Sequence, residues 1–488
     1  MRCSLYSLFI MLLLSCFSAI SSSPSIPVIG NDIVRLTPYM ATYDEKVRLF
    51  YPDEPYKGFW LENLKDEDQF IKWTFNIKDK SEYRVEALIC VEGLTDEAEA
   101  VLELSEKGNT TECHVKSSGW QRVVFDKNIL LDKGNSDVIL KVKKKVNSTS
   151  FDVKLFSLEI STPKAYDLQL KRAKEMKADV NWMNEIPYGF FIHWNSKSMP
   201  EKGDQLKYAD AVNQFDTDQF AEMVHDCGGK LVFFTTTWAE YYFPAPIHAI
   251  DSILPGRTTK RDLIADLSTS LSKYGIRLIL YYHVGHGDKE WWKLQHFSRQ
   301  DAQLLFQNVE TIIREISTRY KDKIAGLWLD DGIGYYPNGA SFERINAAAK
   351  SGNKNMAVCF NPWILPRLTD FQDYYAGEIG LSVESAGLNN PFLPVGGNGY
   401  FVDGPQKGLK ATYSGTFEPG DWTHIYKDSI IGDPMYSLKQ LKDILDESQK
   451  RRNLLMINVR IYQDGRISPK TYNLLKQLKA YGIEKGYY

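Results

Sequence analysis

From about residue 164 onwards, the chain alternates apolar strand candidates with amphipathic helix candidates. The strand candidates are 188–194, 230–238, 276–284, 324–331, 355–363, 373–380, 411–417 and 453–459. Several are continuous apolar runs, which are typical of parallel strands buried on both faces. Eight such units predict an α/β fold of the (β/α)8 type, a TIM-like barrel with some late units distorted.

Helices are expected between many of these strands. In residues 301–320, apolar side chains from Leu305 to Tyr320 recur at every third or fourth position, which places them on one helical face. Residues 261–274 and 437–450 are also predicted to be helical. This region, 163–488, is interpreted as one barrel domain.

A different pattern precedes residue 163. Between 24 and 162, short runs alternate apolar and polar residues, with turn signals between them, at 70–75, 83–89, 100–104, 138–142 and 153–160. Period-two alternation at this spacing predicts an all-β sandwich. The segment resembles the jelly-roll carbohydrate-binding modules that are attached to glycosidases. Glycan binding and a purely structural role as a spacer both fit this pattern.

Residues 1–23 have the features of a signal peptide. Arg2 precedes an apolar run at 8–14, and small residues follow at 18–23. The run is too short for a permanent membrane helix, and no later stretch is apolar enough for a transmembrane span. Residues 13–16 resemble a bacterial lipobox, which would put a lipid anchor on Cys16. We therefore expect a secreted, periplasmic or cell-surface protein, or a lysosomal one if the source is eukaryotic.

Charge and cysteine spacing exclude some classes of partner. A net charge of −3 gives no electrostatic reason to expect nucleic acid binding. No cysteine and histidine pattern has the spacing of zinc ligands, so no metal site is predicted. Cys90 and Cys113 lie in the predicted sandwich, where they form either a disulfide or two buried thiols. Aromatic residues make up 13% of the chain, which suits carbohydrate stacking and a large core equally.

The carboxyl ends of the predicted barrel strands are polar or aromatic. In such barrels the chemistry is located at these ends. Two carboxylates reached from different strands, together with aromatic rings, are what glycoside hydrolysis requires. The residues at these ends are His193, Trp194, Trp238, Glu240, Tyr281, Tyr282, His283, Asp330, Asp331, Asn361, Trp363 and Glu378.

Four segments in the barrel region resemble glycoside hydrolase family 29, the α-L-fucosidases. Residues 188–195 (YGFFIHWN) resemble the family's first strand, and 213–232 resemble its next helix and strand. Residues 327–330 (LWLD) resemble its nucleophile strand, and 453–467 resemble the end of its barrel. The shared order and spacing of these segments support the resemblance.

The resemblance implies a role for several residues. Asp330 becomes the catalytic nucleophile, with Asp331 as the alternative. Glu378 is the first choice for the acid/base, and Glu418 and Glu384 are alternatives because this position varies within the family. The implied sugar-binding residues are His193, Trp194, Tyr282 and Trp328, and Trp422 and His424 are further candidates. No metal or organic cofactor is implied.

The sequence also departs from the family. The usual pair of histidines after the second strand is replaced by Thr235–Tyr242, in which Trp238 and Glu240 would face the sugar. Trp363 stands where an arginine is usual and is also expected to bind the substrate. The expected function is a retaining exo-glycosidase that removes terminal α-L-fucosyl residues from glycans. The alternatives are a glycosidase for another sugar such as α-L-galactose, and a non-catalytic glycan-binding protein.

Overall fold

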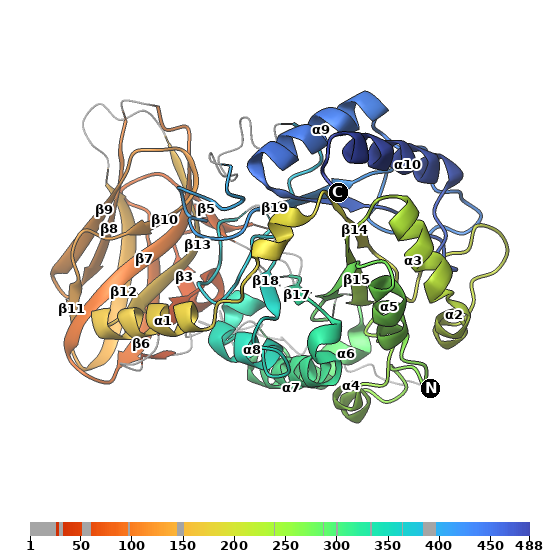
Figure 1. Cartoon of the computed structure of the whole chain (residues 1–488). Coiled ribbons are helices and arrows are strands. Elements are labelled where there is room, and N and C mark those ends of the chain that lie inside the picture. The colour runs from red at the N-terminus through yellow and green to blue at the C-terminus, as the bar shows by residue number, and fades with distance from the viewer. Residues whose placement is uncertain are drawn as a thin grey trace, which may run out of the picture.

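The computed structural model of the chain comprises two units, one built from antiparallel sheets and one from a parallel sheet with helices (Figure 1). Residues 1–23, predicted as a signal peptide with Cys16 within it, and Glu384 lie outside the described residues. The structure describes residues 26–28, 33–50, 60–95, 98–143, 151–238, 240–285, 287–298, 301–331, 334–363, 365–383 and 397–488.

Two sheets form the first unit. All of their strand pairs are antiparallel except β1 with β6. One sheet contains β1 (Ile26–Val28), β3 (Ala41–Tyr43), β6 (Ile71–Ile77), β8 (Ala100–Glu106), β9 (Asn109–Val115) and β12 (Gly134–Lys143). The other contains β2 (Val34–Leu36), β4 (Arg48–Leu49), β5 (Leu61–Leu64), β7 (Ser81–Glu92), β10 (Gly119–Val124), β11 (Ile129–Leu131) and β13 (Asp152–Ser161).

The two sheets share one hydrophobic core. Alternate residues of β6, among them Trp73 and Phe75, are buried in the same cluster as Val85 and Ile89 of β7. The five strands predicted in this region coincide with β6, β7, β8, β12 and β13, because a sheet that is buried on one face requires period-two alternation.

Cys90 and Cys113 are both free, buried thiols. Cys90 is on β7 and Cys113 is on β9, which belong to different sheets. Burial raises the pKa of Cys90 to about 11 and that of Cys113 to about 12. Of the two sequence-based alternatives, the structure therefore contains the buried thiols.

A curled, seven-stranded parallel sheet forms the centre of the second unit, in the order β18-β17-β16-β15-β14-β20-β19. Each strand coincides with a predicted one, because nearly every residue in these strands is buried. The strands are β14 (Gly189–Ile192), β15 (Leu231–Thr237), β16 (Arg277–Tyr282), β17 (Gly326–Leu329), β18 (Ala357–Phe360), β19 (Thr412–Thr416) and β20 (Leu454–Asn458).

Helices pack around this sheet (Figure 1). The longest, α7, buries the apolar face that was predicted for residues 301–320. The helices are α1 (Pro163–Glu175), α2 (Tyr208–Gln214), α3 (Thr217–Asp226), α4 (His248–Ile253), α5 (Leu263–Ser272), α6 (Lys289–Gln295), α7 (Gln303–Tyr320), α8 (Phe342–Ala349), α9 (Leu438–Arg451) and α10 (Pro469–Glu484). Short 3-10 turns are η1 (Pro38–Met40), η2 (Asn181–Glu185), η3 (Lys321–Lys323) and η4 (Tyr336–Asn338).

Residues 373–380, predicted as a strand, form no continuous ladder but hydrogen-bond to both edge strands of the sheet. Asp373 N donates to Val358 O of β18 at 2.7 Å, and Gly380 N donates to Ser414 O of β19 at 3.0 Å. Glu378 and Ser414 form an isolated parallel bridge. The segment thus spans the interval between β18 and β19.

Side chains of the parallel strands point alternately to two clusters. Phe191, Phe233, Tyr281 and Trp328 belong to an inner cluster enclosed by the curled sheet. Their strand neighbours, such as Phe190 and Phe234, pack outwards against the helices. This alternation decides which strand-end residues can meet.

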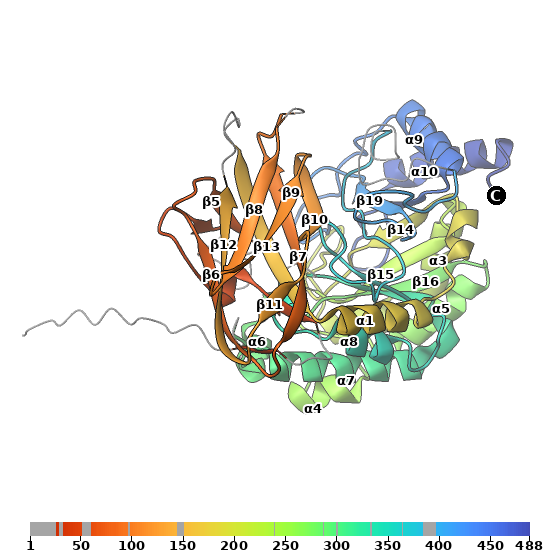
Figure 2. The same cartoon turned by 90° about the vertical axis from the view of Figure 1, so that its left-hand side faces the viewer.

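The two units pack against each other directly, as Figure 2 shows from the side. Trp60, Leu88 and Phe156 of the antiparallel sheets are buried in the cluster that also contains the helices of the second unit. Arg122 of β10 donates to Arg367 O at 3.1 Å across the boundary. Within the described residues, no helix is both long enough and apolar enough to cross a membrane.

Candidate active site

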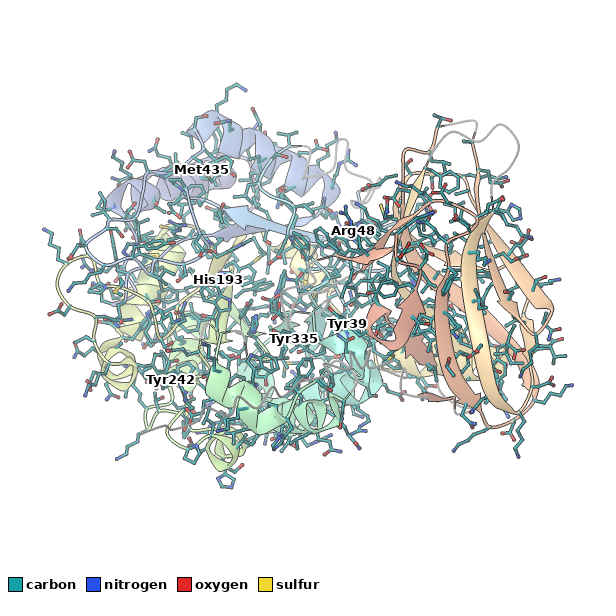
Figure 3. All side chains as sticks on the ribbon, turned by 180° about the vertical axis from the view of Figure 1, so that it is seen from behind. Tyr39, Arg48, His193, Tyr242, Tyr335 and Met435 are labelled. Atoms are coloured by element: carbon teal, nitrogen blue, oxygen red, sulfur yellow. The ribbon has the colours of Figure 1, made fainter. Side chains whose placement is uncertain are left out.

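Side chains from neighbouring strands meet where the carboxyl ends of the parallel sheet converge. His193 follows β14, Asp330 follows β17, and Asn361 follows β18, each two residues beyond an inward-facing residue of its strand. Parallel strands end at one edge of a sheet, so these polar groups lie above the inner cluster. Figure 3 shows His193 within the parallel-sheet unit.

Asp330 is held by donors on both carboxylate oxygens. The Tyr281 hydroxyl donates to Oδ2, and Asn361 Nδ2 donates to Oδ1 at 2.7 Å. Its side chain is 17% exposed, so a reactant can still reach it. Two neutral donors fix the carboxylate in place and leave its negative charge available.

Glu378 is buried beside Asp330 and close to the same Asn361 side chain. Asn361 Oδ1 accepts a hydrogen bond from Trp363 N at 3.0 Å, which fixes the amide so that its nitrogen faces Asp330. Burial and the negative charge of Asp330 raise the pKa of Glu378 to about 8. One carboxyl group near Asp330 is therefore protonated at neutral pH, as a general acid must be.

His193 is buried and neutral. Burial lowers its pKa to about 4, and its Nδ1 lies 2.7 Å from Asn458 Oδ1. Asn458 Nδ2 donates to Trp422 O at 3.0 Å, so the Asn458 oxygen faces the ring and accepts its Nδ1 proton. The remaining ring nitrogen, Nε2, is therefore an acceptor that can bind a hydroxyl group.

Aromatic rings surround His193. Trp422 lies 5.2 Å and Trp238 lies 5.8 Å from its ring centroid, and both indoles are only partly buried. Tyr281 lies 5.2 Å away on another side. Aromatic faces beside a hydroxyl acceptor and two carboxyl groups are suited to binding a sugar ring.

A second acidic residue, Asp331, follows Asp330 in a left-handed conformation with φ of 58°. Its Oδ2 lies 2.7 Å from Nε2 of the buried His283, which is 3.9 Å from Asp330 Oδ2. The ligand atoms of these three side chains lie within 4.8 Å of one another, so they could hold a metal ion. The two-carboxylate chemistry described above requires none.

Comparison with known proteins places most of this site inside a recognised domain. Residues 203–381 match the family model described as Alpha-L-fucosidase. This segment is an alpha-L-fucosidase family domain. It includes Asp330, Glu378, Asn361 and His283, whereas His193 precedes it.

Solved structures of fucosidases are also similar to the chain. A GH29 alpha-L-fucosidase from Bacteroides thetaiotaomicron has 15% identity and a TM-score of 0.43, over 63% of this chain and 74% of that one. The alpha-L-fucosidase AlfC from Lactobacillus casei, in complex with alpha-L-fucose, has 17% identity and a TM-score of 0.44, over 63% of this chain and 98% of that one. No curated protein sequence matches the chain.

Three residues expected to bind the sugar are placed elsewhere. Trp194 and Tyr282 belong to the outer cluster: Trp194 Nε1 donates to Gln463 O at 2.9 Å, and the Tyr282 hydroxyl bonds that of Tyr241. Trp328 is fully buried in the inner cluster, one layer beneath Asp330. Trp194 and Tyr282 are turned away from the site because adjacent strand residues face opposite sides of the sheet, and the full burial of Trp328 leaves it no surface for a sugar.

The other expected residues lie at the site's rim or outside it. Glu240 accepts a hydrogen bond from Ser196 Oγ at 2.7 Å, and Trp363 is 37% exposed two residues beyond Asn361. Glu418 is buried against α10, where it accepts from Thr471 Oγ1 at 2.6 Å. The structure thus brings Glu378, and not Glu418, to Asp330.

The sequence pattern places Tyr281 and Asn361 at strand ends but assigns them no role, and it does not single out Asn458. The signal that identifies the first two is the step of two residues that separates Trp328 from Asp330. The same step from Ile279 leads to Tyr281, and from Cys359 to Asn361. Because side chains alternate between the two faces of a strand, one known inward-facing residue identifies every second residue as facing the same way.

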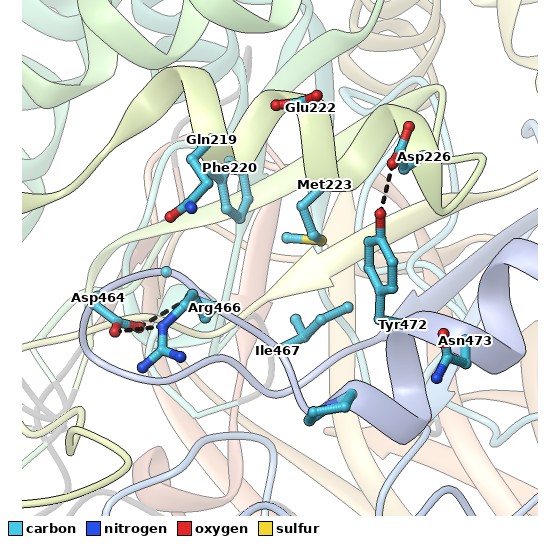
Figure 4. Close-up of a pocket in the computed structure, with 12 residues that line it drawn as sticks. Gln219, Phe220, Glu222, Met223, Asp226, Asp464, Arg466, Ile467, Tyr472 and Asn473 are labelled. Carbon is cyan, nitrogen blue, oxygen red and sulfur yellow. Dashed lines mark hydrogen bonds and ion pairs between the residues drawn. The ribbon is translucent and has the colours of Figure 1, made fainter.

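A hollow of about 470 Å³ lies on the outside of the second unit, between α3 and the start of α10 (Figure 4). Its lining includes Glu222, Asp226, Asp464 and Arg466, and Asp226 accepts a hydrogen bond from Tyr472 at 2.5 Å. None of its lining residues is a strand-end residue of the site described above. The paired carboxyl groups are therefore at the sheet edge and not in this hollow.

Proposed function

We propose that the protein is a retaining exo-glycosidase that releases terminal α-L-fucosyl or closely related residues from glycans. The observation that carries this proposal is that the buried Glu378 lies beside Asp330, which the Asn361 amide holds, at the carboxyl edge of the sheet. Retaining hydrolysis uses two carboxyl groups separated by about 5–5.5 Å, one ionised and one protonated. The raised pKa of Glu378, about 8, divides the roles in this way.

In the proposed mechanism, Asp330 attacks the anomeric carbon while Glu378 protonates the departing glycosidic oxygen. The C–O bond to the leaving group breaks as the bond to Asp330 forms, through an oxocarbenium-like transition state. Glu378, now ionised, then takes a proton from water, which hydrolyses the glycosyl-enzyme ester. His193 Nε2 accepts a hydrogen bond from a sugar hydroxyl, and Trp238 and Trp422 contact the ring.

We also infer that the second unit is a (β/α)8 barrel in which residues 373–380 take the place of the remaining strand. We infer that the first unit is a jelly-roll module. The hydrogen bonds of this segment to both β18 and β19 support the barrel. The single core shared by two sheets supports the module. We divide the chain at residues 162 and 163, where β13 gives way to α1.

The nucleophile is tested by replacing Asp330 with Gly. Hydrolysis of an aryl α-L-fucoside should be abolished, because no group remains to form the ester. Azide should restore part of the turnover by attacking from the vacated space, and it should yield a β-configured fucosyl azide. An active D330G variant without azide would contradict the assignment, and Asp331 would then be examined in the same way.

The sugar itself is the less constrained part of the proposal. The hydroxyls of Thr235, Thr236 and Thr237, which occupy the segment where the family has its histidines, donate to the carbonyls of Trp194, Tyr281 and His283. They are thus committed to the protein backbone and leave sugar contacts to Trp238 and Glu240. This favours an altered sugar specificity, and α-L-galactosides are the second candidate substrates.

A screen of aryl α-L-fucoside, β-D-fucoside and α-L-galactoside separates the alternatives. We expect the first or third to be hydrolysed. Binding of a fucosylated oligosaccharide in calorimetry without hydrolysis of any of these substrates would favour the non-catalytic glycan-binding alternative. The same measurement on the D330G variant shows whether binding survives loss of the carboxylate.

We propose further that residues 1–23 direct export of the chain to a secreted, periplasmic, cell-surface or lysosomal location, where glycans are accessible. The support is the sequence pattern of the segment alone. Mass spectrometry of the mature N-terminus tests this. Cleavage before Cys16 with an added lipid would indicate a lipoprotein, and cleavage near residue 23 would indicate an ordinary signal peptide.

A further inference from the structure

Trp422 belongs to the loop that follows β19, and this loop is closed at its base. Met435 N donates to Phe417 O at 2.9 Å, so the chain returns to the end of the strand that it left. Within the loop, the Trp422 indole packs against the inner cluster, 6.1 Å from the Phe191 ring and 5.2 Å from the His193 ring. The main chain around Trp422 therefore decides where the indole lies in the sugar site.

Two strand ends hold the main chain at the indole and after it. Asn458 Nδ2, at the end of β20, donates to Trp422 O at 3.0 Å. Thr423 Oγ1 donates to His193 O at 2.8 Å, and Asn195 Nδ2 donates to the same Thr423 hydroxyl at 3.2 Å. These bonds tie the loop to β20 and to the segment that follows β14.

Arg460 holds the chain before the indole. Its Nε and Nη2 atoms both donate to Asp421 O, the carbonyl that precedes Trp422. Arg460 is 7% exposed, and Gly420 supplies the room for its guanidinium, because a Cβ at that position would lie 2.8 Å from Arg460 Nη2. Two donors of a rigid guanidinium that meet one carbonyl restrict both the position and the direction of that peptide group.

Asn458 and Arg460 act together on consecutive peptide groups. Arg460 lies two residues beyond Asn458, so the two side chains extend from the same side of the strand end. They reach the carbonyls of Trp422 and Asp421 respectively. The loop is thus held before the indole, at it and after it.

We propose that Arg460 is a positioning residue, which holds the Trp422 indole beside His193 through the carbonyl of Asp421 and so fixes the width of the sugar site. This inference rests on the proposed function. An indole that is already in place binds a sugar ring without the entropy cost of ordering it. A wall of this kind contacts the ring equally in the ground state and the transition state, so its displacement should raise KM and leave kcat little changed.

A spectroscopic measurement tests the placement of the indole without turnover. The chain is labelled with 5-fluorotryptophan, and the Trp422 signal among the 11 tryptophans is assigned by its loss in W422F. In R460M, which keeps the aliphatic part of the side chain and removes the donors, the Trp422 fluorine signal should shift or split, because the peptide before it is released. An unmoved signal in R460M would overturn the proposal.

R466M is the matched control for this measurement. The Arg466 side chain is 51% exposed and forms ion pairs with Asp464 and Glu201, which lie outside the loop after β19. Its loss should leave the Trp422 fluorine signal in place. An equal shift in R466M and R460M would mean that the signal reports a general change of the protein, and this would also reject the role of Arg460.

The kinetic test compares KM with kcat on the aryl glycoside that the wild type hydrolyses. In R460M, KM should rise by about 3–10-fold, as expected for weakened contact with one aromatic face, while kcat changes by less than about twofold. R460K keeps the charge but has no planar fork, so its KM should lie between those of the wild type and R460M. R460K also provides this comparison if R460M does not fold. A fall in kcat at unchanged KM would indicate a merely structural role and would reject the proposal.

A double-mutant cycle shows whether Arg460 acts through the indole. In W422A the wall is already absent, so adding R460M should change KM by less than about twofold. The full effect of R460M in the W422A background would contradict the proposal. Failure of the proposed function is recognised separately, because the wild-type chain would then hydrolyse none of the three aryl glycosides. The fluorine spectra would still decide whether Arg460 holds Trp422.

Discussion

Asn361 donates a hydrogen bond to Asp330 and also lies close to Glu378, so one side chain is next to both acidic groups. Asp330 has a second donor in Tyr281, so it is the better place for the negative charge. Glu378 is left in a buried position beside that charge, which raises its pKa to about 8. The two acids therefore differ in protonation although they belong to nearly identical chemical types.

The pH dependence of hydrolysis should reveal Glu378 directly. A carboxyl group with a raised pKa is protonated below that pKa, so kcat/KM should fall as pH rises through about 8. In E378Q, this basic limb should disappear. The rate on an alkyl fucoside should fall by about 10²–10⁴-fold, while a fucosyl fluoride, which needs no acid, should still react.

Glu418 provides the matched control for this experiment. Its pKa is also raised by burial, to about 7, but its hydrogen bonds lead to Thr471 and the Arg460 main chain. E418Q should leave the basic limb where it is in the wild type. Loss of the limb in E418Q and its retention in E378Q would transfer the acid/base role to Glu418.

At this scale, sequence patterns predicted that Asp330 and His193 follow the carboxyl ends of strands, where the structure places them, but misplaced some neighbours. Tyr282 was chosen over Tyr281 because the two are adjacent and chemically alike, and only the register of β16 decides which one faces Asp330. Asn361 and Glu378 belong to two separate segments of the chain, and the local sequence of neither segment shows that the two side chains lie together. Such contacts depend on the curvature of the sheet.

Among the elements, residues 373–380 determine where Glu378 lies. The aromatic run at Tyr374 and Tyr375 predicted a strand, and the segment does bond to both of its neighbours. It departs from a regular ladder at Gly377, which has φ of 67°. A Cβ at this position would lie 2.0 Å from Thr412 O. The glycine lets the chain approach β19 closely enough to aim Glu378 at Asp330.

Replacing Gly377 with Ala should therefore disturb both stability and activity. We expect a loss of about 2 kcal/mol or more in the free energy of unfolding, from the steric overlap and the left-handed backbone. The value of kcat should also fall, because Glu378 follows directly in the chain. Urea denaturation and steady-state kinetics on an aryl α-L-fucoside measure the two effects.

Gly380, in the same segment, is the control for backbone conformation. It also has a positive φ, 85°, but an added Cβ would meet nothing within 4 Å. G380A should cost about 1 kcal/mol and leave kcat close to that of the wild type. Equal losses in the two variants would show that backbone strain alone, and not the close approach to β19, explains the effect of G377A.

In the whole molecule, the two units are joined by a buried network of charges. Arg122 forms ion pairs with Glu86 and with Glu159, the latter at 3.0 Å, and donates to Arg367 O of the second unit. Arg35 also pairs with Glu159, at 2.7 Å. Removing one member of such a network leaves buried charges without partners, and this is more costly than losing an exposed pair.

R122A should thus lower the free energy of unfolding by about 3–5 kcal/mol. The urea transition followed by tryptophan fluorescence should shift to lower urea, with part of the change in Trp60 and Trp120 near the boundary. R48A is the control, because the Arg48 side chain is 74% exposed in its pair with Glu62. That variant should lose less than about 1 kcal/mol. Comparable losses of unfolding free energy in R122A and R48A would argue against the idea that this network holds the two units together.

The alternation of patterns along the chain predicted both units, because each kind of sheet imposes its own period on the sequence. The surface by which they pack could not be predicted. Leu88 and Phe156 lie on β7 and β13, whose opposite face already accounts for the core of the first unit, and Trp60 directly precedes β5. Apolar residues on the second face indicate a covering partner but do not identify it.

The junction between the units is a single residue long. β13 ends at Ser161, Thr162 caps α1, and the helix begins at Pro163. A tether of this length cannot let one unit swing away from the other, and the buried side chains on both sides oppose hinge motion. A ligand bound by the antiparallel sheets would therefore be held at a constant distance from Asp330.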